Sequence, residues 1–344
     1  MNPPRVTVVM PLFNKASYVR RALASVLGQT FQDFEIVVVN DGSTDGGPDL
    51  VRQIQDPRIR LLDQKNAGVS AARNRGIREA QSELVAFLDA DDEWTSAFLD
   101  TVLSLRAKYP EAGAYATAYR IVMPEGAVRD VIAPACSCDG SQALLKSYFR
   151  IAHQCPVCSS AVAVPLGRFM EVGYFREGVT LGEDVDLWLR IAAYSDIAYS
   201  RTVCAVYHFG GAGSACQSPS TGTLSLMEES LAQITADAGV SDETKDEIRC
   251  YVRRYRLAAI RLYCLCGDLC GAKRLLRHLG PQSLGHLSWL RLWAMVQVSP
   301  GLPSLLRWCD IILLRRRARR RRAPQLPPAK PDRKPSTTPA RLET

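Results

Sequence analysis

The chain of 344 residues lacks long apolar runs, since no stretch of about 18 residues is apolar and free of charge. A transmembrane helix needs roughly that length, so none is expected. The chain also lacks a basic start followed by an apolar core, the pattern of a secretory signal. Its 11 cysteines are an odd number, which does not suit a framework of paired disulfides. We therefore expect a reduced, cytoplasmic protein.

Excess positive charge is absent outside the C-terminal end. The formal net charge is +8, and residues 315–344 hold nine Arg and two Lys against Asp332 and Glu343, which is a net charge of +9. The other 314 residues therefore sum to −1. No aromatic residue interleaves with the Arg run, so a nucleic-acid partner is not expected.

Short β-branched runs alternate with helical patterns in the first third of the chain. Strands are expected at residues 6–10, 35–40, 58–62 and 84–88, with helices between them and after the last. This alternation predicts an α/β fold with a mostly parallel, doubly wound, Rossmann-like sheet. In such a sheet the ligand crevice lies beyond the carboxyl ends of the strands.

The pattern changes twice further along the chain. It becomes helical from about residue 226, and after Arg315 it is rich in Arg and then in Pro. We expect an α/β domain over residues 1–225, a helical region over 226–314 and a disordered tail over 315–344.

Asp89-Ala90-Asp91 places two carboxylates two residues apart at the end of a predicted strand, and Asp92 follows. Carboxylates this close repel one another unless a divalent cation such as Mg²⁺ or Mn²⁺ relieves the charge. An isolated pair of this kind also suits a solvated turn with a helix cap. The polar clusters that follow the other strands, at residues 11–14 and 41–43, favour the metal site.

Two further positions suit a nucleotide, although each is a weak signal alone. Asp41 ends a predicted strand, where a carboxylate accepts hydrogen bonds from a base or a ribose, but its surroundings also read as a turn. Arg73 lies in the first turns of a predicted helix and could reach a phosphate, whereas most such arginines are solvated.

Residues 182–190 open a predicted helix with acids in its first turn. Such acids also serve as a simple cap that interacts favourably with the helix dipole. Asp184 and Trp188 are four residues apart and share a helix face, which would place a carboxylate beside an aromatic platform for a sugar ring. This arrangement would suit a general base next to an acceptor hydroxyl.

Six motifs, in the order PLFN, DGSTD, NAGVSAARNRGI, FLDADDEW, GYF and GEDVDLWLRIA, resemble those of the inverting family 2 glycosyltransferases, which have the nucleotide-sugar-binding A-type fold. The resemblance covers about residues 5–214. It implies that residues 1–225 are the catalytic domain and that the reaction is a single in-line displacement that inverts the anomeric configuration.

The resemblance also implies roles on the donor side. Pro11 and Asn14 would line the base pocket, and Asp41 would bind the base. Arg73 would lie near the base or the diphosphate, and Asp89 would contact the ribose.

Five residues would make the metal and acceptor sides. Asp91 would bind Mn²⁺ or Mg²⁺, and His208 is a second candidate ligand, although a structural or solvated histidine fits as well. Asp184 would be the catalytic base, and Glu183 and Trp188 would shape the acceptor side.

The function implied is a metal-dependent hexosyl- or N-acetylhexosaminyl-transferase. It would move a sugar from a nucleotide-diphosphate donor, with a UDP-sugar favoured, to a lipid-linked saccharide or glycan in cell-surface polysaccharide synthesis. A catalytically silent scaffold of the same fold is one alternative. A sugar nucleotidyltransferase is another, but it should carry a Gly-rich basic loop after the first strand, and PLFNKASYV is not one.

The C-terminal part suggests a membrane surface. Residues 302–314 are mostly apolar, and Arg315 to Arg322 holds seven Arg in eight residues. An apolar helix followed by a polybasic cluster suits an anionic bilayer, so we expect peripheral attachment to the inner face of the plasma membrane. A core helix with a solubilising tail fits the same residues.

Four cysteines have spacing that a zinc site could use. Cys136 and Cys138 are separated from Cys155 and Cys158 by sixteen residues. Free cysteines packed in a core fit as well, since Cys158 begins an apolar run.

Overall fold

The computed structural model describes residues 3–134, 141–179, 181–210, 221–265 and 269–279. The chain divides into two compact units, residues 1–256 and 257–344, and the candidate site lies in the first. The apolar segment 302–314 and the predicted tail 315–344 lie outside the described residues. The functional boundary expected after residue 225 stays a prediction.

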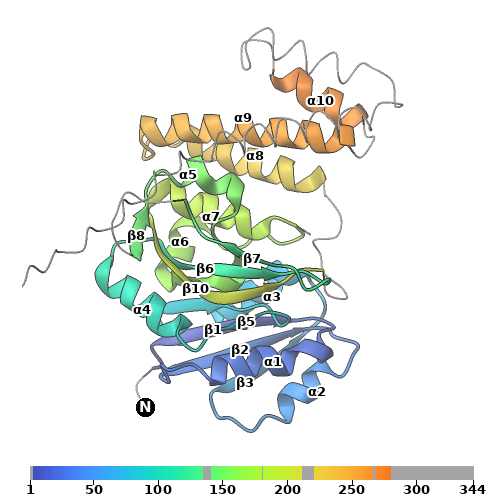
Figure 1. Cartoon of the computed structure of the whole chain (residues 1–344), viewed down its shortest axis with the longest axis vertical. Coiled ribbons are helices and arrows are strands. Elements are labelled where there is room, and N and C mark those ends of the chain that lie inside the picture. The colour runs from blue at the N-terminus through green and yellow to red at the C-terminus, as the bar shows by residue number, and fades with distance from the viewer. Residues whose placement is uncertain (1–2, 135–140, 180, 211–220, 266–268, 280–344) are drawn as a thin grey trace, which may run out of the picture. The chain divides into compact units, whose positions relative to one another are not determined.

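The described strands belong to one sheet in the first unit. They are β1 (Val6–Leu12), β2 (Phe34–Asp41), β3 (Ile59–Gln64), β4 (Leu84–Phe87), β5 (Glu93–Trp94), β6 (Ala114–Val122), β7 (Val128–Val131), β8 (Gln142–Leu145), β9 (Val162–Pro165) and β10 (Ile197–His208). Their order is β3-β2-β1-β4-β9-β6-β10-β5, with β7 beside β6 and β8 beside β10. Figure 1 shows β1, β2 and β3 side by side.

Strand direction confirms the mostly parallel sheet and adds antiparallel members. β1 runs parallel to β2 and β4, β2 to β3, and β10 to β6. β9 is antiparallel to both of its neighbours, β4 and β6, and β5 is antiparallel to β10. An apolar run such as the one in β9 indicates a strand but not its direction, which depends on how the connection returns to the sheet.

Helices follow or flank these strands. They are α1 (Ala16–Leu27), α2 (Gly47–Arg52), α3 (Val69–Arg78), α4 (Phe98–Lys108), α5 (Tyr148–Ile151), α6 (Leu166–Val172), α7 (Glu183–Tyr194), α8 (Thr221–Ala236), α9 (Asp242–Leu265) and α10 (Leu269–Leu279), with 3-10 turns η1 (Ala152–Gln154) and η2 (Ser159–Ala161). None of the helices in the described parts is long and apolar enough to cross a membrane.

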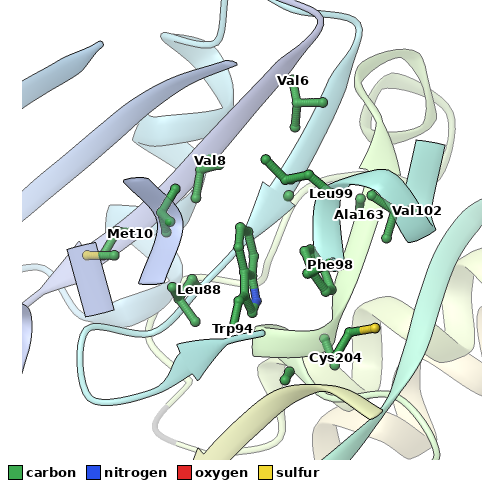
Figure 2. Packing of buried hydrophobic residues seen from close by; sticks show 14 of the residues in the cluster. Val6, Val8, Met10, Leu88, Trp94, Phe98, Leu99, Val102, Ala163 and Cys204 are labelled. Carbon is green, nitrogen blue, oxygen red and sulfur yellow. The ribbon is translucent and has the colours of Figure 1, made fainter. Parts of the chain in front are cut away.

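Apolar residues cover both faces of the sheet because successive side chains of a strand point to opposite sides. From β1, Val8 and Met10 join a core with α1 and α4, where the rings of Trp94 and Phe98 stack at 4.0 Å (Figure 2). Val9 joins the core of the other face. The sheet is therefore doubly wound, as expected from the sequence.

The second core draws on helices from several parts of the chain. Ile77 of α3 and Leu187 of α7 are buried in it, and so are Leu231 of α8 and Ile248 from the first half of α9. Helix α8 thus packs into the same core as α7. In the second unit, Ala272 and Leu276 of α10 are buried.

Candidate active site

The carboxyl ends of β1, β2 and β4 lie at one edge of the sheet because these strands are parallel. Asn14 follows β1, Asp41 ends β2 and Asp89 follows β4 by two residues. This is the edge at which ligands bind in sheets of this kind. The structure therefore brings the three predicted clusters to one edge of the molecule.

The carboxylate of Asp41 is buried and holds the loop that follows β3. Its Oδ1 accepts hydrogen bonds from the Gln64 side chain at 2.8 Å and the Ala67 N–H at 2.9 Å, and its Oδ2 accepts one from the Gly68 N–H at 2.8 Å. Asp41 therefore shapes the start of α3. Its contact with a base stays a prediction.

Asn14 ties the end of β1 to the loop after β2. It has a left-handed backbone, with φ of 52°, and its side-chain oxygen accepts a hydrogen bond from the Thr44 N–H at 2.8 Å. Its own N–H donates to Ser43 Oγ at 3.2 Å. Pro11, near the end of β1, pairs with Val39 of β2. The expected places of Pro11 and Asn14 in a base pocket stay predictions.

Arg73 joins the donor side to helix α7. Its guanidinium is 3% exposed and donates to both carboxylate oxygens of Asp89, at 2.7 and 3.0 Å, and to Glu183 Oε1 at 2.8 Å. It also lies 5.3 Å from the centre of the Phe175 ring. Burial opposes the charge, but the carboxylates of Asp89 and Glu183 outweigh it and raise the pKa of Arg73. Arg73 is therefore a permanent cation between two carboxylates.

Asp184 stands next to this network in the first turn of α7 and is half-buried. Its Oδ1 accepts the Val185 N–H at 2.7 Å, and its Oδ2 lies 3.3 Å from Ser159 Oγ, which donates to it. Burial, and after it the charge of Glu183, raises the pKa of Asp184 to about 6. A carboxylate with such a pKa is ionised near neutral pH and is a better proton acceptor than an exposed one.

The expected place of Trp188 on the acceptor side is wrong. Its side chain is fully buried, and its ring meets that of Phe175 edge-on, with centroids 6.0 Å apart. Residues 184 and 188 do share a helix face, but Asp184 is half-buried in the first turn of α7, whereas Trp188, one turn further along, is fully buried in the core. The Trp188 ring therefore provides no platform for a sugar.

Asp91 is paired with a residue that the sequence did not single out. Lys15 Nζ donates to Asp91 Oδ2 at 2.6 Å, and the Arg21 guanidinium donates to the Asp91 backbone oxygen. Lys15 directly precedes α1, and Arg21 lies within that helix. Nothing in the local pattern around Lys15 predicts this contact, which joins residues 76 positions apart.

His208 is held by the acidic segment after β4. Its Nε2 lies 2.8 Å from Glu93 Oε1, and its backbone N–H donates to Asp92 Oδ1 at 2.9 Å. Since an ionised carboxylate only accepts, Nε2 carries the proton of this hydrogen bond. Burial, with the charges of Asp89 and Asp91, raises the pKa of Asp92 well above its ordinary value.

Two serines of η2 complete the site, and no local motif marks either of them. Ser160 Oγ accepts the Asp89 N–H at 3.1 Å and donates to the buried carboxylate of Asp92. Ser159 donates to Asp184. Both lie near the apolar run that forms β9, so their polar roles appear only when that strand is placed beside β4.

The carboxylates of the site suit a metal ion that is held partly by the protein and partly by a bound ligand. Within the described ranges, no group of three or more His, Cys, Asp or Glu side chains is arranged to hold a metal ion. Asp91 offers a partly exposed carboxylate, while Asp89 is engaged by Arg73. Mg²⁺ and Mn²⁺ are commonly held by one or two carboxylates, with phosphate oxygens and water in the other positions. The proposed role of His208 as a ligand stays a prediction.

The structure describes two of the four cysteines of the zinc hypothesis. Cys155 and Cys158 are free cysteines, the first exposed and the second half-buried. Cys136 and Cys138 lie outside the described residues. The hypothesis therefore stays a prediction.

Residues 7–164 match the protein family described as Glycosyl transferase family 2. The match covers 158 of the 344 residues, and over this part the chain is similar to that family. The matched region contains the strand ends and the Asp89–Asp92 segment described above, and α7 with Asp184 follows it in the chain.

Curated relatives share this region. The chain is 32% identical over 194 residues to an uncharacterized glycosyltransferase of Rickettsia bellii, an alignment that covers 55% of this chain and 26% of the relative. It is 36% identical over 124 residues to the glycosyltransferase GlyA of Streptococcus pneumoniae, which covers 36% of this chain and 18% of GlyA. The chain thus matches about a quarter or less of each of these two relatives.

The fold also has a solved counterpart. The crystal structure of S. aureus TarS 1-349 in complex with UDP-GlcNAc is similar with a TM-score of 0.66 and 17% sequence identity, over 89% of this chain and 87% of that chain. This likeness shows that the matched region and the elements after it have the glycosyltransferase A-type fold.

Proposed function

We propose that this chain is an inverting glycosyltransferase that moves a sugar from a nucleotide-diphosphate donor to an acceptor hydroxyl. The observation that carries the proposal is the network from Asp89 through Arg73 to Glu183, which ends beside Asp184. This network connects the edge of the sheet, which is where donors bind, with Asp184, whose carboxylate has the pKa of a general base.

The proposed reaction is one displacement at the anomeric carbon. The acceptor oxygen forms the new bond to that carbon while the bond to the diphosphate oxygen breaks and its electron pair leaves with the diphosphate. The acceptor proton goes to the Asp184 carboxylate. Since attack comes from the face opposite the leaving group, the configuration inverts.

Asp184 is well placed for this role. Ser159 and the Val185 N–H donate hydrogen bonds that orient its two oxygens. The cation of Arg73 offsets part of the negative charge of Glu183. Glu183 accepts a hydrogen bond from Arg73, and its negative charge helps to raise the pKa of Asp184. Its place on the acceptor side stays a proposal.

Asp91 is the residue that would hold Mn²⁺ or Mg²⁺, with His208 as a second candidate. When bound, such an ion neutralises charge on the leaving diphosphate. The donor-side roles proposed for Pro11, Asn14, Asp41 and Asp89 are contacts with the base and the ribose.

We favour a UDP-sugar as the donor, because the structural counterpart TarS was crystallised with UDP-GlcNAc. We also propose that the acceptor is a lipid-linked saccharide or a glycan. The polybasic cluster from Arg315 to Arg322 supports this, since it would keep the enzyme at an anionic membrane surface.

Calorimetry with UDP, GDP, dTDP and CMP, each with and without Mn²⁺, tests the proposal. We expect one nucleotide to bind and its affinity to rise with Mn²⁺ in the wild-type protein but not in Asp91→Asn. Folded protein that binds none of the four would point to a silent scaffold instead. Inversion is then tested by determining the anomeric configuration of the product by NMR.

A further inference from the structure

The Lys15–Asp91 pair places a protein cation on the carboxylate that is the candidate metal ligand. The Nζ–Oδ2 distance is 2.6 Å, and the side chains of Lys15 and Asp91 are only 13% and 18% exposed. Among the described residues, Lys15 is the one side chain that pairs with the Asp91 carboxylate. A pair this close and this sheltered is stronger than an exposed ion pair.

Helix α1 holds this cation in place. Lys15 directly precedes the helix, and its Nζ lies 5.9 Å from the centre of the Tyr18 ring. Arg21 lies further along α1, with its Cζ 5.7 Å from the centre of the same ring. Its guanidinium donates to the Asp91 backbone oxygen, and its Nε lies 3.8 Å from Glu93 Oε1. The helix therefore presents two cations to the acidic segment, one to its side chain and one to its backbone.

The acidic segment is fixed from its other side as well. Asp92 accepts hydrogen bonds from Ser160 and from the His208 N–H, and Glu93 pairs with the His208 ring. Asp91 therefore has little freedom to turn away from Lys15. A second cation at Asp91 has to compete with the lysine.

We infer that Lys15 is a resident cation of this site, and that a divalent metal binds Asp91 only by displacing it. A metal ion that arrives alone must break the pair and leave a partly buried ammonium group without its carboxylate, which is costly. A metal ion that arrives with a diphosphate brings anionic oxygens that can take the place of Asp91 beside the ammonium group. Lys15 thus couples metal binding to nucleotide binding. The coupling to a nucleotide rests on the proposed function, whereas the effect of Lys15 on Mn²⁺ binding without a nucleotide does not.

Mn²⁺ titration of the nucleotide-free protein, followed by electron paramagnetic resonance of free Mn²⁺, tests the inference. We expect Lys15→Met and Lys15→Gln to bind Mn²⁺ roughly five- to tenfold more tightly than wild type, since the competing charge is gone. Lys15→Arg keeps the charge and should bind like wild type. Arg20→Met is the matched control, because Arg20 lies on α1 but donates to the exposed Gln53 side chain.

A second titration in the presence of UDP measures the coupling. UDP should raise the Mn²⁺ affinity of the wild type more than that of Lys15→Met, because the mutant no longer has a cation to displace. The gain in Mn²⁺ affinity that Lys15→Met brings should also vanish when it is combined with Asp91→Asn.

Equal or weaker Mn²⁺ binding by both neutral variants would overturn the inference, and so would a gain that survives Asp91→Asn. If either Lys15→Met or Lys15→Gln fails to melt cooperatively, the other variant is used in its place. A wild type that binds no nucleotide contradicts the proposed function instead, and the nucleotide-free Mn²⁺ comparison still decides the role of Lys15.

Discussion

At the scale of single residues, burial and neighbouring charges set the pKa of Asp184, the proposed base. The side chain is half-buried, and its pKa is raised to about 6 by burial and by Glu183, against the opposing effect of Arg73. An exposed carboxylate would be a weaker base, and a carboxylate without Arg73 nearby would be protonated to a higher pH. The value therefore reflects a balance between neighbours on α3 and α7.

Asp184→Asn should lower the rate of sugar transfer by about 10² to 10⁴, because the amide cannot accept the acceptor proton. Donor binding should stay nearly unchanged. Asp91→Asn should instead weaken Mn²⁺-dependent donor binding. Steady-state kinetics and calorimetry of both variants separate the two roles, and an equal loss of donor binding in both would contradict them.

The rate of transfer should depend on pH through Asp184. The base must be ionised, so kcat/KM should rise about tenfold per pH unit below pH 6 and level off above it, where the carboxylate is already charged. A pH–rate profile from 5 to 8 checks this, with donor affinity measured at each pH as the control. A flat profile over this range would exclude Asp184 as the base.

At the scale of elements, helix α7 is held by a buried polar cluster behind the site. Asp186 is fully buried and pairs with Arg190 at 2.9 Å, while Ser230 of α8 donates to its other oxygen. Arg190 also donates to the backbone oxygens of residues 172, 173 and 174. This cluster fixes α7 to the segment after α6 and to α8, and so it fixes the position of Asp184.

Arg190→Met should lower the free energy of unfolding by about 1.5 to 3 kcal/mol, because it removes the nearer of two cations from the buried Asp186 and leaves Arg176, which lies 3.7 Å from the same carboxylate oxygen. Thermal or urea unfolding measures the loss. Arg52→Met is the control, since Arg52 is half-exposed and its ion pairs with Asp49 and Asp63 lie at the surface, where such pairs contribute little to stability. Similar losses in the two variants would show that the buried cluster has no special role.

Helix α3 approaches β1 closely enough to require glycine at residue 76. A Cβ added to Gly76 would lie 2.4 Å from Val9 Cγ1. Gly76→Ala should therefore destabilise the protein by about 1 to 3 kcal/mol and shift α3, which carries Arg73. Gly46→Ala is the matched control, because its Cβ would meet no atom within 4 Å. Unfolding curves for the two variants should differ clearly, and matching curves would contradict the tight packing.

At the scale of the whole molecule, charge and chemistry occupy different parts of the chain. The candidate site draws on residues from 11 to 208, where the sheet and its helices lie, whereas the excess positive charge belongs to residues 315–344. Catalysis and attachment to a surface could then be changed independently. This separation is what the proposed membrane role requires.

Deletion of residues 315–344 should release the protein from vesicles that contain anionic lipids and leave transfer to a soluble acceptor intact. Each basic residue near such a surface contributes about 1 kcal/mol, and the segment carries a net charge of +9. Vesicle sedimentation at two salt concentrations measures the effect, with neutral vesicles as the control. Unchanged binding of the shortened protein would remove the membrane argument.

The sequence by itself determined strands β1 to β4, the longer helices and the edge of the sheet at which the site lies, but it did not indicate β5, β6, β7, β8 or β10. Hydrophobic periodicity is a local property, so it indicates each element and its buried face before any tertiary contact exists. Parallel strands then bring their carboxyl ends together, which is why Asp41 and Asp89 were expected at the same edge. The motifs around Asp91 and Asp184 marked the remaining candidates.

Only the tertiary structure decided how these side chains are paired. Lys15 with Asp91, Arg73 with Glu183 and Glu93 with His208 join residues 76, 110 and 115 positions apart. It also decided that Trp188 is buried and that β9 is antiparallel. The physical reason is that ion pairing and burial depend on which surfaces meet after the chain has folded back on itself, and local sequence patterns contain no record of those meetings.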